Sequence, residues 1–84
     1  MKSITIKSKE LVEFGSTVRE RRRALGVTLE ELAEKADRSD REIRDIELGK
    51  VEPLFMTALR VCDACEIDVG ELKEFVPEKN TVNV

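Results

Sequence analysis

The chain has 84 residues, with 15 basic and 18 acidic side chains and a formal net charge of −3. This length allows one small domain. No apolar run approaches the roughly 20 residues that cross a bilayer, which excludes a membrane-spanning helix. The N-terminus lacks the apolar stretch of a secretory signal, so we expect a cytoplasmic protein.

The charge is unevenly distributed along the chain. Residues 1–50 hold twelve Lys and Arg against eleven Asp and Glu, whereas residues 51–84 hold three against seven. An overall acidic balance argues mildly against a nucleic-acid partner. Because the acidity lies mainly in the last third, the first fifty residues keep a near-neutral balance that is compatible with such a partner.

The two ends of the chain carry short alternating patterns. Ile4 and Ile6 alternate with polar residues, and residues 81–84 do something similar. Such alternation is typical of a short strand. The ends either form short strands that pair, within one chain or across a dimer, or remain unmatched tails, which we favour. We expect an N-terminal extension over 1–8, a domain over 9–76 and a C-terminal tail over 77–84.

A first helix is predicted from near Ser8 to Leu25. Apolar residues recur at roughly helical spacing and should face inward: Leu11, Phe14, Val18 and Leu25. Gly26 follows as the expected residue with positive φ after the helix.

Two short helices come next, and each has its own start signal. Thr28 with Glu31, and Ser39 with Glu42, fit capping boxes, in which a hydroxyl and a carboxylate each bond a backbone N–H. The helices should cover 29–36 and 40–48. Two capped helices separated only by a turn must meet at a steep angle, and this arrangement is a helix-turn-helix.

A fourth and a fifth helix complete the predicted domain. Residues 54–65 should form a helix with one apolar face, made of Phe55, Ala58, Val61, Cys62 and Cys65. Asp68 and Glu71 form a third capping pair, which opens a short helix that buries Leu72. The prediction is therefore an all-α, compact five-helix bundle.

Cys62 and Cys65 form a C-x-x-C pair, but the chain has no His and no other Cys. A zinc site needs two more nitrogen or sulfur ligands, so we favour core packing for both thiols; zinc shared across a dimer is the alternative. The sequence also lacks a Gly-rich phosphate loop and a nucleophile beside a base. We expect no catalytic residues, no metal and no cofactor.

Four segments carry a resemblance to a known family: Val18-Arg-Glu-Arg-Arg22, Gly26-Val-Thr28, Glu31-Leu-Ala33 and Ile46-Glu47-Leu-Gly49. From about Phe14 to Leu72 the chain resembles the lambda-repressor-like (Xre/Cro-type) helix-turn-helix DNA-binding family. The resemblance implies a homodimeric, sequence-specific regulator of transcription that binds double-stranded DNA and is not an enzyme.

The resemblance also implies roles for individual residues. Arg22 and Glu47 would pair and fix the third helix against the first. The third helix would enter the major groove, where Arg41 and Arg44 are the best candidates for DNA contact. The full set implied to contact DNA is Arg38, Ser39, Asp40, Arg41, Arg44, Asp45 and Lys50. The alternative is a solvated face held by Asp40–Arg44 and Arg41–Asp45 ion pairs.

Two further expectations concern partners. A homodimer would use the fifth helix and the tails, where Val69, Phe75, Val82 and Val84 are spare apolar residues. The rival to DNA binding is a protein-interaction module on the same fold, such as the antitoxin of a toxin–antitoxin pair. The third helix favours the rival, because with Glu47 it holds two positive and four negative side chains.

Overall fold

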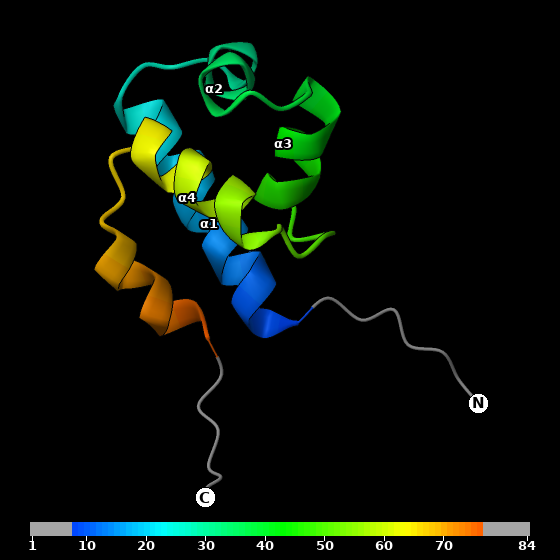
Figure 1. The fold of residues 1–84 in the computed structure, drawn as a ribbon, viewed down its shortest axis with the longest axis vertical. Coiled ribbons are helices and arrows are strands. Elements are labelled where there is room, and N and C mark those ends of the chain that lie inside the picture. Colours follow the sequence, from blue (N-terminus) through cyan, green and yellow to red (C-terminus); the bar gives the residue numbers. More distant parts are fainter. Residues whose placement is uncertain (1–7, 77–84) are drawn as a thin grey trace, which may run out of the picture.

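The structure is a computed structural model that describes residues 8–76, and Figure 1 shows its helices. In chain order they are α1 (Lys9–Ala24), α2 (Leu29–Ala36), α3 (Asp40–Glu47), α4 (Phe55–Ala64) and the 3-10 helix η1 (Val69–Phe75). The all-α five-helix prediction is confirmed, although the fifth helix is of the 3-10 type. The proposed terminal strands lie outside the described residues. Within residues 8–76 no helix is long and apolar enough to cross a membrane.

Side-chain caps explain where the first three helices begin. The Ser8 hydroxyl accepts from Leu11 N at 3.2 Å, and Thr28 and Glu31 form a complete capping box. The box predicted at Ser39 is only half formed. Ser39 Oγ accepts from Glu42 N at 3.1 Å, but the Glu42 carboxylate turns to Arg38 instead, at 3.6 Å. A neighbouring cation therefore competes successfully for the carboxylate that the box would use.

The turn between α2 and α3 is made by Asp37, which has φ 60° and ψ 47°. This is the left-handed region, which Asp enters more readily than most residues. The turn lets Arg38 N donate to Ala33 O at 2.9 Å, which closes α2 before α3 starts. α2 and α3 contact each other and lie together at one end of the molecule (Figure 1).

The core is aliphatic and draws on every helix from α1 to α4. Val18, Leu32, Ile43 and Val61 are completely buried, as is Cys62. Burial of each large aliphatic side chain stabilises the fold by about 1.5–3 kcal/mol. They form a single cluster with six other residues below 5 % exposure: Phe14, Ala33, Ala36, Ile46, Cys65 and Ile67.

Two predicted core residues are exposed instead. Leu25 is 41 % exposed because α1 ends at Ala24, so the chain leaves the buried face at this position. Phe55 is 69 % exposed because it lies in the first turn of α4, beside an open groove. The buried residue of that turn is Thr57, at 1 % exposure. The apolar face predicted for α4 was therefore wrong at its first position.

α1 packs against the end of α3 at unusually short distance, through two glycines. A Cβ on Gly15 would lie 2.6 Å from Glu47 O and closer still to Ile46 O. A Cβ on Gly49, which has φ 73°, would lie 2.8 Å from Val12 Cα. Because these neighbours are backbone atoms that cannot move aside, only glycine permits this approach.

η1 closes the far end of the core. Its start is marked by Asp68 N, which donates to Glu71 Oε2 at 3.3 Å. Leu72 is half-buried, and Phe75 packs edge-on against Phe14 with ring centroids 5.4 Å apart. The ring of Phe75 is therefore used within the chain and is not wholly spare, whereas the use of the fifth helix in a dimer stays a prediction.

Candidate nucleic-acid interface

One face of α3 carries polar side chains that the fold does not use. Ile43, Ile46 and Glu47 are buried, whereas Asp40 and Arg41 are exposed. Arg44 is also exposed, Asp45 is half-buried, and Ser39 caps the helix. Neither Asp40–Arg44 nor Arg41–Asp45 is among the ion pairs of residues 8–76. The alternative that these charges merely pair with each other on the helix surface therefore finds no support in the structure.

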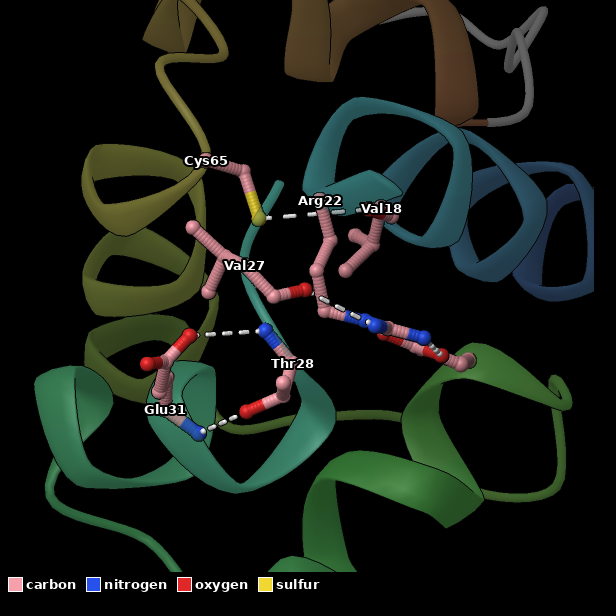
Figure 2. A network of polar contacts seen from close by, with 7 residues as sticks. Val18, Arg22, Val27, Thr28, Glu31 and Cys65 are labelled. Carbon is pink, nitrogen blue, oxygen red and sulfur yellow. Dashed lines mark hydrogen bonds and ion pairs between the residues drawn. The ribbon is translucent and has the colours of Figure 1, made fainter. Parts of the chain in front are cut away.

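Arg22 and Glu47 join α1 to the end of α3. Arg22 Nε donates to Glu47 Oε2 at 2.7 Å, and its second terminal nitrogen donates to Oε1 at 3.1 Å. The side chains are only 11 % and 5 % exposed. Arg22 also donates to Val27 O at 3.0 Å, which ties in the loop before α2 (Figure 2). The hydrogen bond to Glu47 raises the pKa of Arg22, so the cation is permanent and fixes α3 against α1.

Arg38 faces the fold rather than the solvent. Its Nε donates to Thr57 Oγ1 at 3.0 Å, and a terminal nitrogen donates to Asp37 O at 3.0 Å. The same guanidinium lies 3.6 Å from the carboxylate of Glu42. Arg38 therefore connects the turn, α3 and the start of α4.

These contacts change the charge that α3 presents. The sequence gives the helix two positive and four negative side chains. Glu47 is neutralised by Arg22 and Glu42 by Arg38. The remaining charges are two arginines and two aspartates, so the outward face is balanced rather than acidic.

Further cations lie after α3 and on α1. Lys50 is exposed directly after α3. Of the arginines in the second half of α1, Arg21 binds Glu71 at 2.8 Å, and this hydrogen bond lowers the pKa of Glu71. Arg19 and Arg23 make no ion pair with any residue in the range 8–76. Of these two, only Arg19 lines a cleft with Arg44 of α3, so its charge lies beside this face.

The two cysteines belong to the core and not to this surface. Burial raises the pKa of both Cys62 and Cys65 to about 11. Cys65 Sγ lies 3.9 Å from Val18 O, as a weak thiol donor (Figure 2). In the part of the chain that the structure describes, no three Cys, Asp or Glu side chains converge as metal ligands do.

Sequence reasoning missed two residues near the interface. Thr57 was not singled out, because its hydroxyl gives no hint of the distant Arg38 that it binds. Arg19 was not singled out, because four arginines lie close together at positions 19 and 21–23, and only the ion pairs of the folded chain distinguish Arg19 from Arg21 and Arg22. A signal existed for Arg22 alone, through the resemblance.

The steep α2–turn–α3 unit, the Arg22–Glu47 pair and the polar outward face of α3 define a helix-turn-helix protein of the lambda-repressor-like (Xre) type. The model of a family described as a helix-turn-helix domain matches residues 13–75, and the chain belongs to that family. Its fold is similar to the crystal structure of the clp gene regulator ClgR from C. glutamicum, with a TM-score of 0.73. That match has 26 % sequence identity and covers 86 % of this chain and 92 % of the other. No curated protein sequence matches the chain.

Proposed function

We propose that this protein is a sequence-specific regulator of transcription that binds double-stranded DNA as a homodimer, with α3 in the major groove. The observation that carries the proposal is the charge balance of α3. Because Glu42 and Glu47 are paired within the fold, Arg41 and Arg44 are not outnumbered on the outward face. The family match and the likeness to a gene regulator support the same function.

Individual residues take different parts in this proposal. Arg41 lies on the outward side of α3, where a guanidinium can donate two hydrogen bonds to O6 and N7 of guanine. Asp40 and Asp45 accept from cytosine N4. Ser39, the N-cap of α3, lies at the same end of the helix as Asp40. Lys50 contacts a phosphate, which adds affinity without sequence information. Arg38 positions α3, because its guanidinium is already bound by Thr57 and Glu42.

Selection from a random double-stranded DNA pool at near-physiological salt tests the proposal. The parent should recover an inverted repeat with half-sites about one helical turn apart. An Arg41→Ala/Arg44→Ala variant should recover none. The charge-matched control is Lys35→Ala/Arg60→Ala, which removes two exposed cations away from the outward face of α3 and should behave like the parent. The proposal fails if the parent enriches no sequence.

The homodimer in this proposal uses an apolar surface at the start of α4. Leu54, Phe55 and Met56 are 76, 69 and 56 % exposed. Beside them lies a groove of about 240 Å³ whose apolar lining includes Leu11, Phe14, Pro53, Ala58, Leu72 and Phe75. A protruding Phe next to an apolar groove is self-complementary under two-fold symmetry, because each copy can fill the groove of the other.

Sedimentation equilibrium tests this dimer. A Phe55→Glu variant should be monomeric, and because Phe55 is exposed the substitution leaves the core intact. A Val69→Glu variant is the control, since Val69 is 53 % exposed on η1 and does not line the groove. Dissociation by Val69→Glu and not by Phe55→Glu would place the interface on η1 instead.

The same apolar surface also fits one rival to this proposal. A protein-interaction module, such as the antitoxin of a toxin–antitoxin pair, would cover Leu54, Phe55 and Met56 with another protein. A monomeric parent that enriches no DNA would favour this rival. We propose that the protein acts in the cytoplasm, by binding and not by catalysis.

A further inference from the structure

A cleft lies between α1 and α3, on the flank of the proposed reading helix. It has a volume of about 240 Å³ and is lined by Arg19, Arg22, Leu29, Arg44, Glu47 and Leu48. Three of these six residues are arginines, contributed by two different helices. The cleft is therefore a place where guanidinium groups from separate parts of the chain converge.

The charge of this cleft is positive once its internal ion pair is taken into account. Arg22 and Glu47 neutralise each other at 2.7 Å. Arg19 and Arg44 form no ion pair within residues 8–76, so the two together leave a charge of about +2 at the cleft. Glu30, in the first turn of α2, does not line the cleft, but after the larger effect of Glu47 it also raises the pKa of Arg22 and so offsets part of this positive charge.

The lining of the cleft suits a phosphate group. Guanidinium groups bind phosphate oxygens through pairs of parallel hydrogen bonds, which arginines from two helices can offer to one anion. The aliphatic side chain of Leu29 also lines the cleft, and partial shielding from water strengthens such contacts. Arg44 lies on α3 itself, about one turn after Arg41.

We propose that this cleft holds a phosphate of the DNA backbone, bound between Arg19 and Arg44 at the edge of the major groove. The proposal rests on the proposed function and deepens it, because it assigns different roles to the two arginines of α3. Arg44 takes a phosphate together with Arg19 and is indifferent to sequence. Of the two arginines, only Arg41 reads a base.

The test measures affinity for the selected duplex and for a scrambled duplex between 0.1 and 1 M salt. Each phosphate contact adds about 0.9 to the slope of log affinity against log salt, which corresponds to about eightfold at 0.1 M relative to 1 M. Arg19→Gln and Arg44→Gln should each reduce the slope by about 0.9 per bound protomer, equally on both duplexes. Arg41→Gln should instead weaken the selected duplex more than the scrambled one.

One control variant and one double variant complete the experiment. Arg23→Gln removes an exposed arginine one turn along α1 that does not line the cleft, and it should leave the slope unchanged. The Arg19→Gln/Arg44→Gln double variant should lose less affinity than the product of the two single losses, because both residues bind one phosphate.

The outcomes separate this inference from the proposed function. A parent that binds neither duplex overturns both. A parent that binds, with Arg19→Gln indistinguishable from Arg23→Gln, overturns the cleft alone. Competition by millimolar inorganic phosphate at constant ionic strength would identify a site for free anions and would also overturn the assignment to the DNA backbone.

Discussion

Replacement of Glu47 by Gln gives the sharpest test of how α3 is held. The substitution keeps the size of the side chain but removes the negative charge that faces Arg22. Arg22 is 11 % exposed and bonds both carboxylate oxygens, at 2.7 and 3.1 Å. After the substitution a nearly buried cation loses its counter-charge and keeps only neutral acceptors, the Gln oxygen and Val27 O.

The expected loss follows from the depth of the pair. Removal of one partner from a buried ion pair destabilises a protein by about 3–5 kcal/mol. Because the Gln oxygen still accepts one hydrogen bond, we expect about 2–3 kcal/mol for Glu47→Gln. A domain of this size has a free energy of unfolding of roughly 4–10 kcal/mol, so the loss is a large share of it.

Urea unfolding followed by circular dichroism measures the effect. For a denaturant slope of about 1 kcal/mol per molar, the midpoint should fall by about 2–3 M. The matched control is Glu71→Gln on η1, which breaks an ion pair of similar length, at 2.8 Å, to Arg21, a neighbour of Arg22 on α1. Its partners are 39 and 31 % exposed, so water screens the charges and the midpoint should stay near that of the parent. Equal midpoints for the two variants would refute the argument from burial.

Three other predictions follow from contacts described above. Gly15→Ala should destabilise the domain by about 1–3 kcal/mol, because the new methyl group meets the backbone of Glu47, and a thermal melt that matches the parent would contradict this. Thr57→Val should lower the free energy of unfolding by about 1 kcal/mol, because Arg38 Nε loses its acceptor, and urea unfolding measures it. Cys62 and Cys65 should ionise near pH 11 in the native protein but from about pH 9 in the unfolded chain. The free energy of unfolding should therefore be unaffected by these thiols below pH 9 and should fall as the pH rises to 11, since only the unfolded thiols ionise in that range. Iodoacetamide labelling at pH 8 should therefore be slow in the native protein and fast in urea, and fast native labelling would contradict the burial of both thiols.

Local signals in the sequence predicted the helices well. Thr28 with Glu31 marks the start of α2, and both hydrogen bonds of that box are present. Ser39 marks the start of α3 at the predicted residue. Such signals succeed because a cap involves residues only three positions apart, so the neighbours in the sequence contain the whole interaction.

Features that depend on distant residues were not predictable in this way. Glu42 leaves its box for Arg38, and Arg38 in turn binds Thr57, nineteen residues further on. Phe55 fits the apolar period of α4 but is exposed, because no element closes over the first turn. The division of the arginines of α1 into paired and unpaired ones also depends on where Glu47 and Glu71 lie in the folded chain.

The separation between the two sides of α3 has a consequence for how such a protein changes its target. The inner side is fixed by Ile43, Ile46 and the pair of Glu47 with Arg22, and by the backbone approach at Gly15. On the outer side, Arg41 forms no ion pair in the range 8–76. Substitutions at such positions leave the free energy of unfolding almost unchanged. If α3 reads DNA as proposed, new operators can therefore be acquired by single substitutions, without a second change elsewhere to restore folding.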